Sequence, residues 1–505
     1  MEIDMTNITS PELLQKEVEK MNSFGVRLTG TKAQRNFIKY LKSRIHDMGI
    51  ETFSDPSRFM RWEETNKKLV IKDLDEEFEV PISSAFPYSG RTPAEGITAQ
   101  MTLVKEKHVG YLNATDKIAV VEVNELDFLP SEIAFNERER SIPEGLKLPS
   151  HYSGPVATAF VNFPFLKIAK LAGAKGVICI WKGINDDCIE GQYLPFILDY
   201  QGIPAVWVNS KNGQKVIEEA EKGAFATLTL EGIIDEYAKT ESFWCVLDGE
   251  EEGESVIINT HTDGTNCIEE NGPIAMLAMI KYLKDKPLKR THIFVFVTGH
   301  FRLPNFKNID GGGVQATSKW LTAHRSHWDG KEGHLKAVAG LSVEHLGCKM
   351  WKTDENGEYR QTGDVETEIV YTGNKMMDDI YFKSLEDRKK VYTLTLRGHN
   401  LLHFGEGQPL FNCGIPEIAL VTAPDCLCVI SDNNEMDKFD AELMYEQTVS
   451  FIKMALMIDS LTAQEIGPCD GYSAIATKKM VEDSTAKIKE VASEVASKVK
   501  YILPF

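Results

Sequence analysis

The sequence lacks several features that define specialised classes of protein. It contains no apolar run that approaches the roughly 20 residues a membrane span needs, and residues 1–7 lack the basic and then apolar pattern of a signal peptide. Lysine and arginine nowhere form a cluster longer than a pair or two, and the net charge is −19. An acidic surface argues against nucleic acid or an anionic membrane as a partner.

Cysteine is also scarce, with nine residues in a chain of 505, and most lie inside apolar segments such as residues 177–180. An odd number of scattered, apolar cysteines predicts reduced, buried thiols in a cytoplasmic protein. Cys426 and Cys428 are too closely spaced for a usual zinc-binding pair and are expected to pack in a strand.

The length of the chain predicts at least two domains, because single hydrophobic cores stop growing well below 505 residues. Helical periodicity is clear over residues 10–50, short strands begin near residue 80, and strands alternate with helices after Glu231. Near the C-terminus, apolar residues recur at helical spacing over residues 488–502. This stripe is expected to dock on the body of the protein, with a homodimer contact as the alternative.

Three apolar strands of the predicted α/β region each run into a polar cluster. Residues 256–259 lead to His261 and Asp263, residues 293–297 lead to His300, and residues 338–343 lead to Glu344 and His345. In open α/β sheets, ligands bind beyond the carboxyl ends of the strands. Three histidines and two carboxylates at one edge of a sheet predict a metal or acid/base site, although a single histidine at a strand end is more often a hydrogen-bonded structural group.

Several motifs resemble the M28 family of co-catalytic zinc aminopeptidases. They are residues 24–31 (FGVRLTGT), residues 260–263 (THTD) and residues 411–416 (FNCGIP). The resemblance implies a doubly wound α/β fold with a mixed sheet of the zinc-aminopeptidase (phosphorylase/hydrolase-like) type, formed by residues 1–81 and 234–465. Residues 82–233 resemble a protease-associated (PA) domain, an inserted and mostly β domain, through residues 172–178 and 202–206. Residues 466–505 are then a C-terminal helical extension.

The resemblance also implies a set of metal ligands. His261 matches a metal-binding histidine of the family, and Asp263 matches the residue that orients this histidine without contacting the metal. The bridging carboxylate falls on Glu269 or Glu270, with Glu270 taken as the ligand, and the later aspartate ligand falls on Glu344.

The chain departs from the family pattern at two catalytic positions. The family's Glu-Glu pair, a general base followed by a ligand, is replaced by residues 298–301 (TGHF), and its last histidine is missing near residues 428–431. His300 and His345 are new, and imidazole serves both as a zinc ligand and as a general base. His399, His403 and Glu406 lie in a loop that is expected to approach the same edge as part of a substrate pocket, or else to be ordinary surface residues.

These residues together predict a metal-dependent hydrolase of an amide or related bond, metallopeptidase-like but not an ordinary aminopeptidase. We expect about one zinc ion per chain, with manganese and iron suited to the same ligands, and a small-molecule or short peptide-like substrate. His300 is the expected general base and a candidate ligand, with Glu269, Glu270 and His345 as alternative bases.

Two other readings of the sequence stay open. The chain could be a catalytically silent binding or scaffold protein that kept the peptidase fold. It could also be a metal-independent or differently metallated lyase or C–C hydrolase that uses His300 and Glu344. Tightly bound metal would separate the metal-dependent hydrolase from the lyase or C–C hydrolase. A screen for turnover would separate both enzymes from a scaffold.

Overall fold

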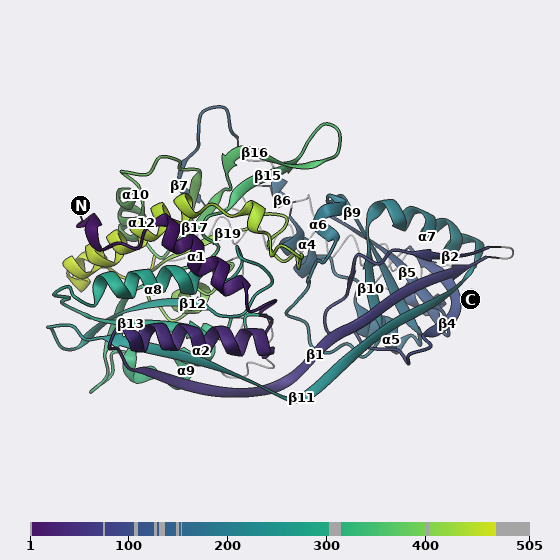
Figure 1. Ribbon diagram of the computed structural model, residues 1–505, viewed down its shortest axis with the longest axis horizontal. Coiled ribbons are helices and arrows are strands. Elements are labelled where there is room, and N and C mark those ends of the chain that lie inside the picture. Colours follow the sequence, from purple (N-terminus) through teal and green to yellow (C-terminus); the bar gives the residue numbers. More distant parts are fainter. Residues whose placement is uncertain are drawn as a thin grey trace, which may run out of the picture.

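Two long antiparallel strands, β1 (Thr52–Lys72) and β11 (Phe225–Leu247), run through the molecule and join its two lobes (Figure 1). The computed structural model describes residues 3–73, 76–105, 110–125, 129–130, 137–147, 151–152, 154–301, 315–399 and 403–470. We call the lobe built on strands β12–β14 and β17–β19 the main lobe, and the lobe built on strands β3–β5, β9 and β10 the second lobe.

The α-helices of the described residues are α1 (Pro11–Asn22), α2 (Lys32–Asp47), α4 (Pro155–Val161), α5 (Leu166–Leu171), α6 (Asp186–Ile189), α7 (Ser210–Lys222), α8 (Gly272–Leu283), α9 (Thr317–Ala323), α10 (Lys375–Ser384), α11 (Gln408–Asn412), α12 (Ala441–Ser460) and α13 (Ala463–Ile466). The other strands are β2 (Glu77–Val80), β3 (Ser84–Ala85), β4 (Ile97–Val104), β5 (Ile118–Asn124), β6 (Leu129–Pro130), β7 (Glu137–Ser141), β8 (His151–Tyr152), β9 (Gly176–Lys182), β10 (Ala205–Val208), β12 (Glu254–His261), β13 (Thr291–Val297), β14 (Lys336–Ser342), β15 (Lys349–Thr353), β16 (Tyr359–Val365), β17 (Glu368–Thr372), β18 (Thr393–Arg397) and β19 (Glu417–Thr422). Among the described helices, none has the length and apolar character that crossing a membrane requires.

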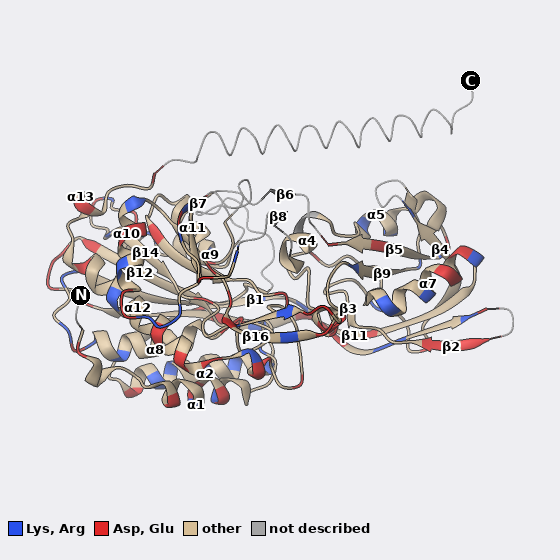
Figure 2. Cartoon of the chain, turned by 90° about the horizontal axis from the view of Figure 1, so that it is seen from above, with Lys and Arg blue, Asp and Glu red and all other residues tan. Residues whose placement is uncertain are grey.

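The main lobe has a mixed sheet with the strand order β11-β13-β12-β14-β19-β17-β18-β7. Strands β13, β12, β14 and β19 are parallel, so their carboxyl ends share one edge. Their apolar side chains are buried on both faces, because helices α1, α2, α8 and α12 cover one face and helices α9 and α11 cover the other (Figure 2). The doubly wound mixed α/β fold predicted from the sequence is confirmed.

Local signals explain where the outer helices begin and end. Thr31 caps α2 by accepting a hydrogen bond from the N–H of Gln34 (3.2 Å), and the chain leaves the helix through Gly49 at a positive φ of 80°. Acidic residues of α1 face basic residues of α2, as in the ion pair between Glu17 and Arg44 (2.7 Å; Figure 2). The helices predicted within residues 10–50 are therefore confirmed.

The second lobe contains the sheet β3-β10-β9-β5-β4, which continues through β11 into the main lobe. Strands β4, β5, β9 and β10 are parallel, and helix α7 packs against β4, β5 and β9. The bounds of the insert at residues 82 and 233 stay a prediction. Strands β1 and β11 cross between the lobes, and β7, from within that range, pairs with β18 of the main lobe.

Two further expectations concern Cys426 and Cys428 and the apolar stripe near the C-terminus. The placement of Cys426 and Cys428 in a strand is wrong, because β19 ends at Thr422 and both buried thiols lie in the turn that follows. The stripe over residues 488–502 lies outside the described residues, as does most of the proposed extension.

Candidate metal centre

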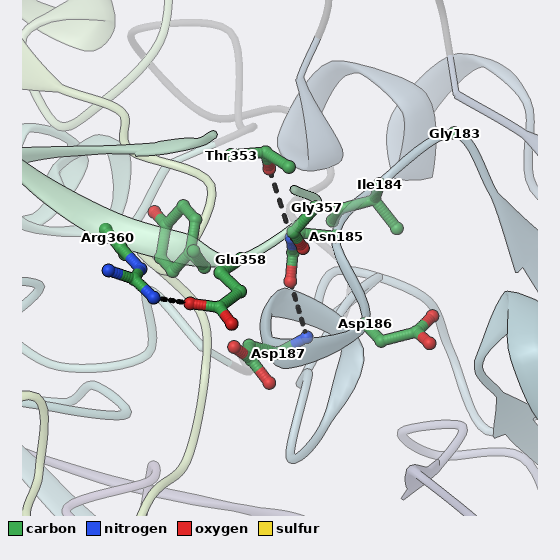
Figure 3. Close-up of a pocket in the computed structure, with 10 residues that line it drawn as sticks. Gly183, Ile184, Asn185, Asp186, Asp187, Thr353, Gly357, Glu358 and Arg360 are labelled. Carbon is green, nitrogen blue, oxygen red and sulfur yellow. Dashed lines mark hydrogen bonds and ion pairs between the residues drawn. The ribbon is translucent and has the colours of Figure 1, made fainter. Parts of the chain in front are cut away.

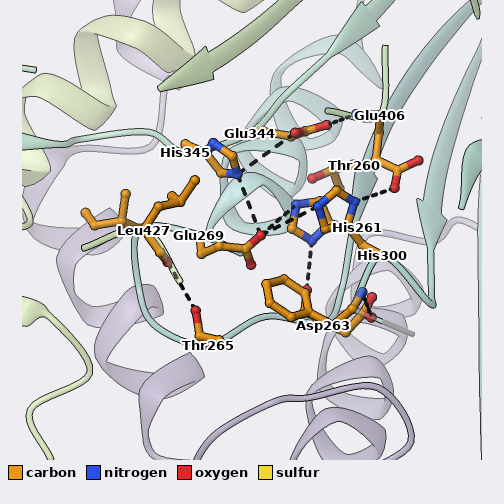
Figure 4. A network of polar contacts seen from close by, with 12 residues as sticks. Thr260, His261, Asp263, Thr265, Glu269, His300, Glu344, His345, Glu406 and Leu427 are labelled. Atoms are coloured by element: carbon orange, nitrogen blue, oxygen red, sulfur yellow. Dashed lines mark hydrogen bonds and ion pairs between the residues drawn. The ribbon is translucent and has the colours of Figure 1, made fainter. Parts of the chain in front are cut away.

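Three imidazole rings and one carboxylate meet beyond the carboxyl ends of β12, β13 and β14 (Figure 4). The Nε2 atoms of His261, His300 and His345 lie 3.7, 3.8 and 3.7 Å from Oε1 of Glu269. All four side chains are buried. The three strand-end clusters singled out in the sequence thus come together at one point.

Two of these rings are oriented so that an unprotonated nitrogen faces Glu269. Nδ1 of His261 lies 2.8 Å from the carbonyl oxygen of Asp263, and Nδ1 of His345 lies 2.8 Å from the carbonyl oxygen of Thr422. A carbonyl only accepts, so each Nδ1 carries the proton and each Nε2 keeps its lone pair. Neither Nε2 atom has a hydrogen-bond partner in the described part of the chain. Two buried, unpartnered lone pairs facing a carboxylate form a cradle for a cation.

The donor set fits a divalent transition metal. One ligand atom each from His261, Glu269 and His345 lies within 4.8 Å of the others, and Oε2 of Glu269 also lacks a hydrogen-bond partner within the described ranges. Burial and the charges of the neighbouring rings lower the pKa of His261 far below its usual value, and lower that of His345 to about 3. Both rings are therefore neutral at physiological pH, the form that binds metal.

The backbone at His345 explains how β14 delivers two adjacent side chains to the site. His345 has a φ of 55°, which is uncommon for a residue with a side chain. Glu344, just before it, accepts a hydrogen bond from the N–H of Glu406 (2.7 Å) with one oxygen, while the other oxygen lies 3.9 Å from Nε2 of His345. Burial raises the pKa of Glu344 to about 7. Glu344, predicted as a ligand, lies beside the cluster with one free oxygen.

Glu270, also predicted as a ligand, is held by Arg27. Its carboxylate forms an ion pair with Arg27, and both side chains are fully buried. Of the consecutive residues Glu269 and Glu270, Glu269 is the one whose carboxylate lies near the imidazoles of the described cluster. In the structure, Glu269 therefore stands where the predicted ligand set had Glu270.

Asn266 orders the loop that carries Glu269, and sequence reasoning missed it. Its side-chain oxygen accepts hydrogen bonds from the N–H groups of Ile268 (3.0 Å) and Glu269 (3.2 Å). Its amide group donates to three carbonyl oxygens after β19, those of Cys426 (3.2 Å), Leu427 (2.9 Å) and Val429 (2.9 Å). The only signal in the sequence is an asparagine three residues before a glutamate pair, and its distant partners cannot be read from that.

Asp263 acts on His261 through its main chain. Its carbonyl orients the ring, as described above, whereas its carboxylate accepts hydrogen bonds from Thr29 and from the N–H groups of Gly299 (3.0 Å) and Phe301 (3.0 Å). Because Gly299 and Phe301 flank His300, this carboxylate fixes the turn after β13.

His300 is paired with Glu406. Its Nδ1 lies 2.7 Å from Oε1 of Glu406, whose carboxylate also accepts from the N–H groups of Ala316 (3.1 Å) and Thr317 (2.7 Å). Burial lowers the pKa of His300, but the hydrogen bond and charge of Glu406 outweigh it, so the net shift is upward. The ring stacks on His261, with centroids 4.2 Å apart. This pair can take up a proton next to the cluster.

The loop of His399, His403 and Glu406 reaches the site through Glu406. The ring of His403 is buried and stacks on Tyr371 with centroids 4.0 Å apart, and neither of its nitrogens has a hydrogen-bond partner among the residues that the structure describes. Burial lowers the pKa of His403 to about 3 and lowers that of His399 as well. Their assignment to a substrate pocket stays a prediction.

A separate cavity of about 770 Å³ lies between the two lobes (Figure 3). It is lined by Gly183, Ile184, Asn185, Asp186, Asp187, Thr353, Gly357, Glu358, Tyr359 and Arg360. There the amide group of Asn185 donates to Thr353 Oγ1 (3.1 Å) and to the carbonyl of Gly357 (3.0 Å). This cavity shares no residue with the histidine cluster, so the chemistry is assigned to the cluster.

No protein-family model matches the sequence, and no curated protein has a similar sequence. Solved structures do resemble it. The Peptidase M28 precursor of Shewanella amazonensis superposes with a TM-score of 0.61 at 15% identity, covering 92% of this chain and 100% of that one. The chain has the fold of the M28 zinc aminopeptidases.

Two further structures agree. The aminopeptidase of Aneurinibacillus sp. strain AM-1 gives a TM-score of 0.59 at 14% identity, covering 90% of this chain and 94% of its own. BSAP, a zinc aminopeptidase from Bacillus subtilis, gives 0.58 at 14% identity, with 90% and 97% covered. Identities this low speak for a shared fold, and function has to be argued from the site.

Proposed function

We propose that this protein is a metal-dependent hydrolase of an amide or related bond, with one zinc ion held by His261, Glu269 and His345 and with Glu344 beside them. One observation carries the proposal. The Nδ1 atoms of His261 and His345 are tied to main-chain carbonyls, which leaves two buried Nε2 lone pairs facing Glu269 without a hydrogen-bond partner among the described residues. Such an arrangement is costly unless a cation occupies it.

The chemistry divides between the ion and the chain. A zinc ion at this place supplies an acidified water and a Lewis acid for the scissile carbonyl. His300 accepts the proton that this water loses, because its Nδ1 is bonded to Glu406 and its Nε2 faces Glu269. The carboxylate of Glu406, itself held by the N–H groups of Ala316 and Thr317, stabilises the imidazolium that forms.

The substrate is proposed to be a small molecule or a short peptide-like compound. Ordinary aminopeptidase activity is not proposed, since residues 298–301 carry no carboxylate. The zinc aminopeptidases of similar fold support hydrolysis as the reaction class. A cytoplasmic location and a homodimer are part of the same proposal.

The first test is the metal content of the purified protein. We expect about one zinc ion per chain, and we expect His261→Ala to abolish its retention because one of three ligands is lost. His292→Ala is a matched control. His292 is also fully buried and also has its Nδ1 on a main-chain carbonyl two residues away (Arg290, 2.9 Å), but it lies at the opposite end of β13.

Elemental analysis and circular dichroism on the three proteins decide the matter. An active wild-type protein that carries no metal and ignores chelators would end the proposal in favour of a metal-independent reaction. A protein that binds zinc but turns over no amide, ester or related substrate would be a scaffold.

A further inference from the structure

The metal centre is surrounded by more carboxylates than one ion needs. Five acidic side chains at or beside the cluster are at most 1% exposed: Asp263, Glu269, Glu270, Glu344 and Glu406. Glu269 and Glu270 both reach under the main chain at Gly264, where an added Cβ would collide with an oxygen of each carboxylate. No described residue forms a hydrogen bond with Oε2 of Glu269 or with Oε2 of Glu270. Two adjacent carboxylates with free oxygens could hold a cation of their own.

Arg27 already supplies a positive charge at this place. Its side chain is fully buried, and its Nε and Nη2 atoms contact the same oxygen of Glu270. Its other donors are bound near the end of α1, to the carbonyls of Gly25 and Met21 (3.3 Å) and to Oδ1 of Asn22 (3.3 Å). A guanidinium cannot lose its proton in a protein, and this one is anchored on two sides.

We propose that Arg27 is a resident cation that neutralises Glu270 and thereby limits the cluster to a single divalent metal ion. The inference rests on the proposed function, because it presupposes the ion at His261, Glu269 and His345. Arg27 occupies one carboxylate that could otherwise bind metal, and its charge repels a second cation in a medium that screens poorly. Arg27 is therefore a positioning residue of the metal centre, without contact to a substrate.

The decisive experiment compares zinc stoichiometry by isothermal titration and elemental analysis. Wild-type protein, stripped of metal and titrated with zinc, should saturate at one ion per chain, and Arg27→Met should saturate at two. Arg35→Met is the matched control. It removes an arginine that also bonds a main-chain carbonyl, that of Gly30, and it should saturate at one ion.

A second pair of variants keeps the inference testable if Arg27→Met does not fold. Glu270→Gln leaves the charge of Arg27 uncompensated, so the dissociation constant for the first zinc should rise by about tenfold or more. Arg27→Met/Glu270→Gln removes both charges and should bring that constant back to within about threefold of wild type. Circular dichroism on each variant verifies folding.

Each other outcome has a defined meaning. Wild-type protein that binds two zinc ions, or folded Arg27→Met that binds one, overturns the role of Arg27 and leaves the proposed function intact. Unchanged affinity in Glu270→Gln overturns it too. So does weak binding that persists in the double variant, because Glu270 would then be a ligand itself. Wild-type protein that binds no zinc overturns the proposed function as well.

Discussion

His300 differs from the other two histidines of the cluster in what holds it. His261 and His345 are bonded to carbonyl oxygens, which fix a ring but give little help to a positive charge. His300 is bonded to the carboxylate of Glu406, which favours the protonated ring. Two histidines are thus suited to bind metal, and the third is suited to carry a proton.

Replacing His300 with glutamine tests that difference. Glutamine keeps a similar size and a polar edge but cannot carry the proton, so kcat should fall by about 10²- to 10⁴-fold while the melting temperature stays near that of wild type. A chromogenic amide or ester found by screening the wild type provides the assay. His324→Gln is the control, since His324 is also bonded to a carboxylate (Asp55, 2.6 Å) but lies away from the cluster. A His300→Gln protein with full activity and reduced stability would assign the residue a structural role.

Glu125, in the second lobe, should make stability depend on pH. Burial raises its pKa from 4.5 to about 7, although Trp181 donates a hydrogen bond to it (2.7 Å). The folded protein keeps a proton that the unfolded chain loses, so stability that is fully present below pH 4.5 is lost as the pH rises to about 7. Glu125→Gln does not titrate. At pH 8 it should be more stable than wild type by up to about 3 kcal/mol.

Urea unfolding of both proteins from pH 4.5 to pH 8 measures this effect. The two midpoints should differ least at pH 4.5 and most at pH 8, so the low-pH end serves as an internal control. Parallel curves across the range would show that Glu125 titrates alike in the folded and unfolded chain.

At the scale of elements, the strands that carry the histidine cluster could be predicted from the sequence, and the strands that join the lobes could not. Strands β12, β13 and β14 are covered on both faces and therefore read as unbroken apolar runs in the sequence. Strands β1 and β11 form a ribbon that is half exposed over much of its length, and charged residues interrupt any apolar pattern. Their pairing depends on partners far away in the chain, which local periodicity does not encode.

The same limit applied to the choice between Glu269 and Glu270. The sequence could place a carboxylate after β12 but could not tell which of two neighbours would face the histidines. That choice depends on Arg27, which lies far back in the chain and meets Gly264 across an isolated bridge. His261, His300 and His345 could be predicted because each lies at the end of an apolar strand or within three residues of it.

The connection between β12 and α8 should tolerate no side chain at Gly264. A Cβ there would collide with the carboxylates of Glu269 and Glu270. Gly264→Ala should therefore displace Glu269 and lose bound zinc, which elemental analysis measures. Gly414→Ala is the control, because a Cβ there meets nothing within 4 Å and its positive φ of 78° costs only local strain. Zinc retained at wild-type affinity in Gly264→Ala would show that Glu269 is not a required ligand.

At the scale of the whole molecule, the second lobe reaches the histidine cluster of the main lobe. Phe196 stacks on Phe301 with centroids 4.4 Å apart and lies 5.5 Å from the ring of His300. Main-chain hydrogen bonds from Tyr193 to Cys428 (2.9 Å) and from Ile430 to Gly191 (2.9 Å) hold the lobes together beside it. The wall behind His300 is thus built from both lobes.

Phe196→Ala should weaken this joint. The side chain is 6% exposed, so truncation should cost about 3–5 kcal/mol of stability, and kcat/KM should fall because His300 loses its support. Phe225→Ala, at a residue of β11 that is 51% exposed, is the control and should change neither quantity appreciably. If Phe196→Ala has wild-type kcat/KM and stability, the contact between the lobes is incidental to the site.

The hydrogen bond between His345 and the carbonyl of Thr422 has a consequence for the order of events during synthesis. Thr422 is the last residue of β19, so the ring of His345 cannot be locked until that strand has left the ribosome and paired with β14. His261 and Glu269 emerge long before. A nascent chain therefore passes through a stage in which His261 and Glu269 are present and the ring of His345 is not yet locked. Under the proposed function, stable retention of the ion begins only when β19 has joined the sheet.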